Sequence, residues 1–223
     1  MGAVDEFSVN PPQVIPKADI IVFCVPVQSI VGVAAKILSH AKPQAILTDV
    51  GSVKKNIVDS MRRLLTKRPD LSFVGGHPMA GSDKYGVQNA IPSLYEKTKC
   101  VLIPSTKSKR ALVEVKKMWE SVGASCVMMD AGKHDHILSL ISHLPHLLAF
   151  ALFSQVKNAS KKDPLVSSLV AGSFRDMTRI AASEPEMWAG ILQMNKKNIK
   201  KAAVEFLKKL NAILARPHFL LKP

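Results

Sequence analysis

Residues 19–25 read DIIVFCV, a continuous apolar run that is rich in β-branched side chains. A strand buried on both faces has this composition, because neither of its faces meets water. Strands of this kind belong to parallel sheets that helices cover on both sides. The run therefore predicts an α/β fold for the part of the chain around it.

The rest of residues 1–129 continues this pattern, with short β-rich runs separated by helical stretches. We expect strands at 19–25, 45–49, 72–75, 99–103 and near 125–129. We expect helices at 28–39, from Ser52 to about Leu65, and at 108–121. Strands that alternate with helices indicate a parallel sheet with right-handed crossovers.

The strand pattern stops after about Asp130, and three helical stretches follow. They are 133–158, which Pro145 interrupts, 164–182, which breaks near Gly172, and 186–214. The last stretch repeats apolar residues with a helical period, so one of its faces is suited to burial. The sequence thus predicts an α/β domain over 1–129 and an all-helical domain over 130–223.

Lysine and arginine total 31 against 17 acidic residues, which leaves a formal net charge of +14. This excess favours anionic partners, whether small carboxylates or phosphates, nucleic acid or an acidic membrane. The polar face of the last helix holds lysines at positions 196, 197, 200, 201, 208 and 209. They form either a solvated face or an anion-binding surface. No aromatic residues interleave with them, which disfavours a platform for single-stranded nucleic acid.

No apolar run reaches the length of about 18 residues that a membrane span needs. Residues 1–15 lack the basic start and apolar stretch of a signal peptide. The three cysteines, Cys24, Cys100 and Cys126, are odd in number and indicate no disulfide framework. We therefore expect a cytoplasmic protein that binds neither membranes nor nucleic acid.

Polar residues follow the predicted strand 45–49 in the motif TDVGSVK, residues 48–54. Ligands bind at the carboxyl ends of strands in open parallel sheets, and the free N–H groups of a helix start favour anions. Asp49, Gly51 and Ser52 are therefore candidates for contact with a ligand. The alternative is that Ser52 only caps the helix that follows it.

A second motif, GGHPMAG at 75–81, follows the next predicted strand. The paired glycines permit a sharp turn and close approach of a ligand, and Pro78 stiffens the backbone beside His77. On a rigid loop at the strand-end surface, His77 could donate, accept or take up a proton near neutral pH. A structural histidine is the alternative.

The helical part contains the motif SHLPH at 142–146. His143 and His146 lie three residues apart and face roughly the same way on a helix. They are candidates for an anion or substrate contact, for hydrogen-bonded core positions, or for a metal. A metal is disfavoured because no third ligand lies at the usual spacing, and His134 and His136 would point in different directions.

A fourth motif, SFRDMTR at 173–179, contains Arg175 and Arg179. They lie four positions apart, so on a helix both guanidiniums project to one side. Two such groups are well suited to binding carboxylates. Surface ion pairs, with Asp176 or Glu184 for example, are the alternative.

Taken together, these motifs resemble the prephenate/arogenate dehydrogenase family of tyrosine biosynthesis. The matching stretches are ADIIVFCVPV, LTDVGSVK, FVGGHPMAGSDKYGV, ISHLPHLLAFAL and GSFRDMTRIAASEPEMW, in order over about residues 18–215. The resemblance implies an N-terminal Rossmann-type domain, a C-terminal helical domain that forms a homodimer, and an active site between them. It also implies oxidative decarboxylation of prephenate or arogenate with NAD or NADP and without a metal.

The resemblance further implies roles for single residues. His77 matches the catalytic histidine that hydrogen-bonds the ring hydroxyl of the substrate, and Ser52 matches the serine that helps orient it. Val25 and Pro26 match the strand-end loop beside the cofactor, which Asp49, Gly51 and Ser52 would also contact. Asp83 stands where the family often has Glu, at a position linked to active-site gating. The positions around the substrate are Ser142, His143, His146, Arg175 and Arg179, of which Arg179 is the expected carboxylate clamp.

In the reaction that the resemblance implies, a hydride leaves the carbon that bears the ring hydroxyl and passes to the nicotinamide. Neutral His77 accepts the hydroxyl proton as that oxygen becomes a carbonyl. Carbon dioxide is then lost and the ring becomes aromatic, which makes the step irreversible.

One departure from the family pattern is large, because no G-x-G-x-x-G occurs in the 223 residues. In the family this turn follows the first strand and holds the pyrophosphate of the cofactor. About one βαβ unit is therefore expected to be absent, which should expose an apolar sheet edge. Two hypotheses follow: a dehydrogenase with compromised cofactor binding, or a non-catalytic remnant that dimerises and binds an aromatic-pathway carboxylate.

Overall fold

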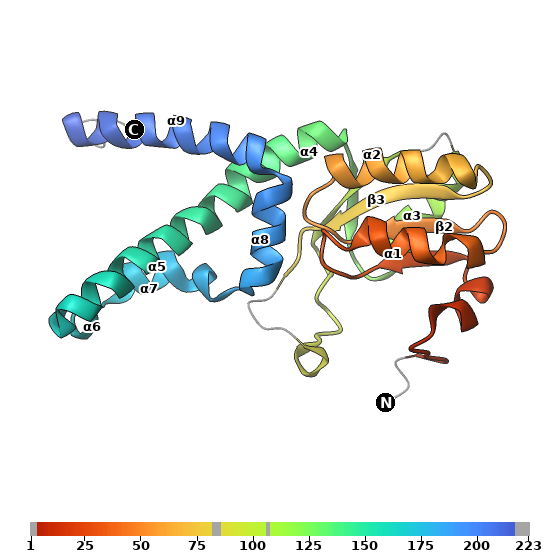
Figure 1. Ribbon diagram of the computed structural model, residues 1–223, viewed down its shortest axis with the longest axis horizontal. Coiled ribbons are helices and arrows are strands. Elements are labelled where there is room, and N and C mark those ends of the chain that lie inside the picture. The colour runs from red at the N-terminus through yellow and green to blue at the C-terminus, as the bar shows by residue number, and fades with distance from the viewer. Residues whose placement is uncertain (1–3, 82–85, 106–107, 217–223) are drawn as a thin grey trace. The chain divides into compact units, whose positions relative to one another are not determined.

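The computed structural model describes residues 4–81, 86–105 and 108–216. The chain divides into two compact units, residues 1–134 and 135–223. The first unit contains a sheet with its covering helices, and every regular element described in the second unit is a helix (Figure 1). An α/β part followed by a helical part is the organisation that the sequence predicts.

Five strands form one sheet in the order β1-β2-β3-β4-β5. They are β1 (Ile20–Phe23), β2 (Ile46–Asp49), β3 (Ser72–Pro78), β4 (Lys99–Pro104) and β5 (Ser125–Met128). Neighbouring strands are parallel except β3 and β4, which run antiparallel. The prediction of a parallel sheet is therefore wrong for this pair. The described residues between β3 and β4 contain a 3₁₀ turn (Val87–Asn89) but no α-helix, so the chain folds back alongside β3 instead of crossing over.

Helices cover both faces of this sheet, so the first unit has three layers. Helices α1 (Ile30–Ile37) and α2 (Lys55–Leu64) lie on one face, and α3 (Lys109–Ser121) lies on the other (Figure 1). The interface between α3 and the sheet is formed by buried side chains of α3, β2, β3 and β4. They are Ala111, Val115, Trp119, Ile46, Val74, Cys100 and Leu102. Because the strands carry apolar side chains on both faces, the sheet can pack against helices on either side.

Strand β3 is longer than the sequence indicates, because residues 75–78 continue the strand instead of forming a loop. Glycine and proline are depleted in strands, which is why this part of β3 resembles a loop in the sequence. A Cβ atom on Gly76 would lie only 2.5 Å from the carbonyl oxygen of Asp49. The glycine is therefore needed for the close approach of β3 to β2, and not for a turn.

A buried ion pair joins the end of β2 to the start of α2. Lys54 and Asp49 have no exposed surface, and Lys54 Nζ donates to Asp49 Oδ2 and to the carbonyl oxygen of Gly76, at 2.7 Å for the latter. The backbone N–H of Gly51 donates to Oδ2 (3.0 Å) and that of Gly76 to Oδ1 (3.1 Å). We call these four residues the Asp49 network. It supplies the partners that a buried carboxylate requires.

Strand β1 lies at one edge of the sheet, and among the described strands it pairs only with β2. Val22 of this strand is 37% exposed, and Phe7 and Val9 in the preceding segment are largely exposed. This segment contains two 3₁₀ turns, Pro11–Gln13 and Ile15–Lys17. An exposed apolar edge is what the resemblance leads us to expect here.

The second unit begins within a continuous helical segment that Pro145 does not break. Helix α4 (Ala131–Leu138) runs into a π-helical turn (Ser139–His143) and then into α5 (Leu144–Lys162). Proline lacks an N–H and its ring collides with the carbonyl four residues earlier. The wider π-helical turn directly before Pro145 accommodates the ring, so the expected interruption becomes a local widening.

The remaining helices pack against α5 (Figure 1). They are α6 (Pro164–Ser168), α7 (Gly172–Thr178), a 3₁₀ turn (Arg179–Ala182), α8 (Pro185–Met194) and α9 (Lys196–Ala215). The predicted single helix over 186–214 is two helices, because the chain turns at Asn195 (φ −106°, ψ 17°). The side chain of Asn195 bonds the backbone of Asp135, an arrangement that competes with helix continuation.

We expect Lys54→Met to destabilise the chain by about 3–5 kcal/mol, because it leaves the Asp49 carboxylate buried without its cation. The matched control is Lys55→Met, which removes the exposed pair with Asp59 and should cost at most about 1 kcal/mol. Urea unfolding at neutral pH measures both. Equal midpoints for the two variants would contradict the structural importance of the buried pair.

Candidate active site

The carboxyl ends of the parallel strands β1 and β2 carry residues expected to contact a cofactor. The strands pair as far as Phe23 opposite Asp49, so the loops that follow them leave the sheet side by side. Val25 is half-buried and Pro26 is exposed after β1, and Ser52 is half-buried after β2. All three are accessible at the place where open α/β sheets bind nucleotides.

Asp49 lies beneath these loops and does not reach solvent. Its carboxylate accepts hydrogen bonds from the backbone of Gly51 and of Gly76. Gly51 precedes Ser52 and Gly76 precedes His77, so one carboxylate fixes the backbone beside both residues that the sequence marks as catalytic. Asp49 and Gly51 are therefore buried residues that fix the backbone of the site, and they are not on its surface.

Ser52 does not cap the helix that follows it. Helix α2 begins at Lys55, and the residue at its N-cap position is Lys54, not Ser52. The interpretation of Ser52 as a helix cap is therefore wrong. Its side chain lies in the loop between β2 and α2, next to the Asp49 network.

His77 lies inside β3, opposite Val101 of β4, and is 7% exposed. The prediction of a loop position is therefore wrong. Nδ1 of His77 lies 2.8 Å from Nε2 of His134, and the two rings meet edge to face with centroids 5.1 Å apart. A histidine on a rigid strand with one ring nitrogen held in place has the fixed orientation that acid–base catalysis requires.

His134 is a residue of this site that the sequence reasoning missed. It is fully buried in α4, whereas His136 is exposed. The side chain of Asp130 accepts hydrogen bonds from the backbone of Gly132 (2.7 Å) and Lys133 (3.1 Å), and these bonds lower the pKa of its carboxyl. Asp130 thus stays ionised and caps α4. No local sequence signal marks His134, because its partner His77 lies 57 residues away in the sequence.

In the second unit, His146 and His143 both contact Trp188 of α8. His146 stacks on the indole with centroids 3.6 Å apart, and His143 meets it edge-on at 6.1 Å. Nδ1 of His146 lies 2.9 Å from the carbonyl oxygen of Ser142, so Nδ1 carries the hydrogen and the neutral ring presents Nε2 as an acceptor. Burial lowers the pKa of His146 and favours this neutral form.

His143 is fully buried, and its protonation state follows from its neighbours. Nδ2 of Asn195 lies 2.8 Å from the carbonyl oxygen of Asp135 and 3.0 Å from Nδ1 of His143. Since a carbonyl only accepts, the amide nitrogen must face it, and Nδ1 of His143 must then accept. The hydrogen of the neutral ring therefore sits on Nε2. His143 has the character of a hydrogen-bonded core histidine.

Arg175 lies in α7 and Arg179 opens the 3₁₀ turn that follows it; both are exposed. In the part of the chain that the structure describes, neither guanidinium has an acidic partner, so surface ion pairing does not explain them. Both can bind an anion. Asp83, the expected gating residue, lies outside the described residues.

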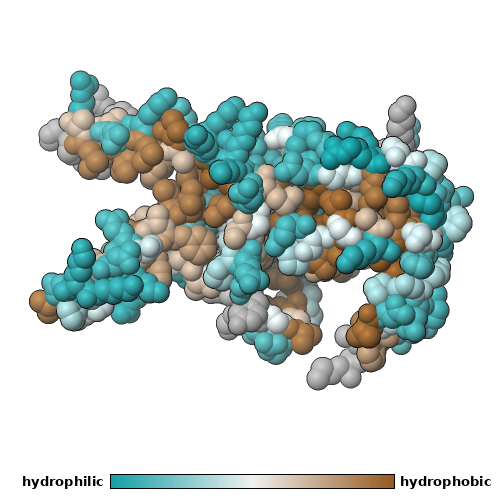
Figure 2. Space-filling view, in the orientation of Figure 1, coloured by the Kyte–Doolittle hydropathy of each residue, from teal (hydrophilic) through white to brown (hydrophobic). Residues whose placement is uncertain are grey.

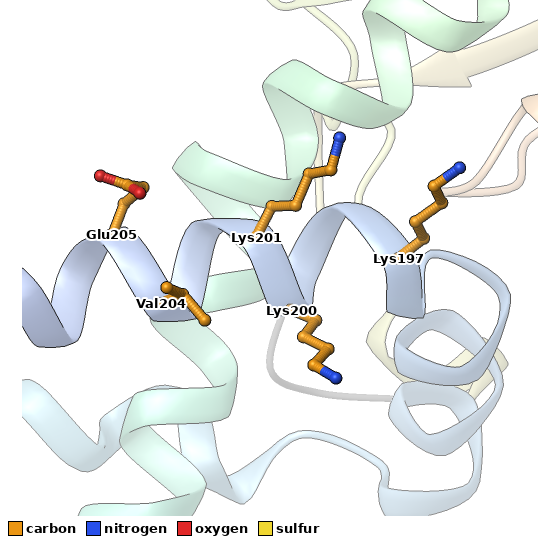
Figure 3. A pocket seen from close by; sticks show the side chains of 5 residues that line it. All are labelled: Lys197, Lys200, Lys201, Val204 and Glu205. Carbon is orange, nitrogen blue, oxygen red and sulfur yellow. The ribbon is translucent and has the colours of Figure 1, made fainter.

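The lysines of α9 do not converge on one point. A hollow of about 500 Å³ lies beside this helix. In Figure 3, Lys197 and Lys201 point to one side of the helix and Lys200 points to the other. Lys208 pairs with Glu205 at 3.0 Å. This arrangement favours a solvated face over an anion-binding surface.

Among the described residues, no group of three or more His, Cys, Asp or Glu side chains is placed to hold a metal ion. The cysteines are free thiols, and burial raises the pKa of Cys100 to about 12. A thiol with such a pKa is not a nucleophile near neutral pH.

Two family models together match almost the whole chain. Residues 1–128 match the nucleotide-binding domain of prephenate dehydrogenase, and residues 130–216 match its dimerization domain. Prephenate dehydrogenase of Bacillus subtilis is 36% identical over 216 residues, which cover 96% of this chain and 57% of that protein. Cyclohexadienyl dehydrogenase of Zymomonas mobilis is 34% identical, with 89% of this chain and 69% of that protein covered. The chain thus spans little more than half the length of the Bacillus relative.

Solved structures give the same result. Prephenate dehydrogenase from Aquifex aeolicus, in complex with hydroxyphenyl propionate and NAD+, superposes with a TM-score of 0.87 at 38% identity, over 97% of this chain and 76% of that one. Arogenate dehydrogenase from Synechocystis gives a TM-score of 0.79 at 28% identity, over 99% and 78%. With both of its units matched in order, the chain belongs to the prephenate dehydrogenase family.

Proposed function

We propose that this chain carries the catalytic residues of an NAD- or NADP-dependent dehydrogenase that oxidatively decarboxylates prephenate or arogenate in the cytoplasm. The observation that supports this most is His77, which is buried on a strand with one ring nitrogen held by His134. We propose that Nε2 of His77 meets the hydroxyl of the substrate. The relatives are named prephenate, cyclohexadienyl and arogenate dehydrogenases, so both substrates stay in the proposal.

In the chemical step of this reaction, the chain itself contributes His77, which takes up one proton. When bound, the nicotinamide supplies the acceptor for the hydride that leaves the hydroxyl-bearing carbon. Nε2 of His77 accepts the hydroxyl proton while the carbonyl forms. Carbon dioxide then leaves, and the electrons of the broken carbon–carbon bond stay in the ring, which becomes aromatic.

Pro26 and Ser52 fit the nicotinamide side of a dinucleotide, because both are accessible at the adjacent carboxyl ends of β1 and β2. Val25 contributes to the same loop, while Asp49 and Gly51 support it from beneath. The 223 residues contain no glycine-rich turn for the pyrophosphate. A second candidate function, which does not need that turn, is a chain that dimerises and binds an aromatic-pathway carboxylate without catalysis.

For the substrate, we propose Arg179 as the clamp on a carboxylate, with Arg175 four positions before it in the sequence. Both are exposed and, among the described residues, have no acidic partner. His146 adds an acceptor at Nε2 and is held by the backbone of Ser142. His143 supports Trp188 from the core. The role of Asp83 as a gating residue stays a prediction.

We also propose that the second unit forms a homodimer. The helical segment Ala131–Lys162 is long and apolar enough to cross a membrane, yet its most apolar window is only 28% buried. Along α9, Val204, Leu207, Leu210 and Leu214 are 39–70% exposed, and Figure 2 shows apolar surface on the side of α9 that faces α5. A second copy would cover this surface, as the matched dimerization domain suggests.

The proposed role of His77 is tested by His77→Asn in a fusion that supplies a glycine-rich βαβ unit before Met1. Asparagine keeps a polar group but cannot take up the proton, so turnover should fall by about 10²–10⁴-fold. Substrate affinity should change little, because the arginines are intact. Undiminished turnover would refute the assignment.

Titration calorimetry of the 223-residue chain with NAD and NADP tests the cofactor proposal. Charge-assisted hydrogen bonds contribute about 1.5–3 kcal/mol each. The lack of two or three of them at the pyrophosphate should weaken binding about 10²–10⁶-fold relative to the fusion. A micromolar dissociation constant for the 223-residue chain would show that another segment holds the pyrophosphate.

Light scattering tests the dimer, and the mass should be that of two chains at concentrations well above micromolar. Leu207→Lys should raise the dissociation constant about tenfold or more, since burial of a leucine contributes about 1.5–3 kcal/mol. Lys208→Ala, at the next position on the polar face, is the control and should leave the mass unchanged. A monomeric parent chain would contradict the proposal.

A further inference from the structure

The hydrogen bond between His77 and His134 has a direction, and the direction decides what His77 can do. Nδ1 of His77 and Nε2 of His134 lie 2.8 Å apart, so one nitrogen carries a hydrogen and the other presents a lone pair. A neutral imidazole has one nitrogen of each kind. The direction of this bond therefore fixes whether Nε2 of His77 is an acceptor or a donor.

Burial limits the charge that the pair can hold. His77 is 7% exposed and His134 is not exposed at all. Charging both rings would place two N–H groups against each other and two positive charges in a dry interior, which is costly. At least one of the two rings is therefore neutral and presents the lone pair of this hydrogen bond.

We propose that Nδ1–H of His77 donates to Nε2 of His134, and that His134 is a positioning residue that keeps a lone pair on Nε2 of His77. This inference rests on the proposed function, in which His77 takes up a hydroxyl proton. With the bond reversed, Nε2 of His77 would carry the hydrogen and could not accept one. In the proposed direction, uptake of the proton at Nε2 gives an imidazolium that keeps its Nδ1–H bond to His134.

Both ends of this hydrogen bond are anchored by backbone. His77 is held in β3 by its pairing with β4 and by the Asp49 network, which contacts the preceding Gly76. His134 sits in the first turn of α4, which the side chain of Asp130 caps. Rings held in this way on two elements keep the acceptor in place before a substrate arrives.

The tautomer of His77 can be read directly from ¹⁵N chemical shifts of the 223-residue chain labelled on histidine. A protonated ring nitrogen and an unprotonated one give well-separated signals, and the loss of signals in His77→Asn identifies those of His77. Above neutral pH, we expect a protonated Nδ1 and an unprotonated Nε2. The opposite pattern in the parent chain would overturn the proposal without any variant of His134.

Two variants at position 134 test the cause. His134→Gln places a carbonyl acceptor near the former Nε2 and should preserve the His77 tautomer. His134→Leu removes the acceptor and should shift His77 toward the form with hydrogen on Nε2. His136→Leu, at an exposed position two residues away, is the control and should leave the His77 signals unchanged.

An unchanged His77 tautomer in folded His134→Leu would also overturn the proposal. These shifts are measured without turnover, so they separate this inference from the proposed function. A chain that shows the expected tautomer but gives no dehydrogenase activity, even when fused to a glycine-rich unit, would count against the proposed function alone.

Discussion

The Asp49 carboxylate is the group on which the geometry of the first unit depends most. A buried charge is tolerated only with a full set of partners, and here Lys54, Gly51 and Gly76 supply them. Each partner lies on a different segment: the start of α2, the loop after β2, and β3. Satisfying one carboxylate therefore brings the loop of Ser52 and the strand of His77 into a fixed relation. The requirement for glycine at position 76 follows from the same closeness.

A second feature unites His143 and His146 of the second unit, since in each ring a neighbouring group determines which nitrogen carries the hydrogen. The carbonyl of Ser142 takes the Nδ1–H of His146 and leaves Nε2 as an acceptor. The carbonyl of Asp135 orients Asn195, which makes Nδ1 of His143 an acceptor. In both cases a backbone carbonyl determines which ring nitrogen carries the hydrogen. The carbonyl acts directly on His146 and through the side chain of Asn195 on His143. Residues such as Asn195 matter here for the direction in which they donate.

The sequence was informative where local chemistry decides the outcome. The apolar run around Phe23 predicted a buried strand, and helical periodicity predicted most helices. It failed at Gly76, where close contact with β2 overrides the low strand propensity of glycine. It failed at Asn195, which turns the chain because of a bond to Asp135, sixty residues away in sequence. His134 and Lys54 were missed for the same reason, since their partners are set by the fold.

The π-helical turn at Ser139–His143 has a consequence for how the long helical segment is interpreted. A turn of this kind holds one residue more than an α-helical turn, and each residue of an α-helix rotates the side chain by about 100°. The row of side chains on one face of α4 is therefore rotated relative to the corresponding row on α5. A single helical wheel drawn over 131–162 would assign the residues of one of these helices to the wrong face. A deletion of one residue within 139–143 could leave the helix unbroken while turning His146 away from Trp188. In evolutionary terms, an insertion of one residue at this point can redirect a whole helix face without adding a loop.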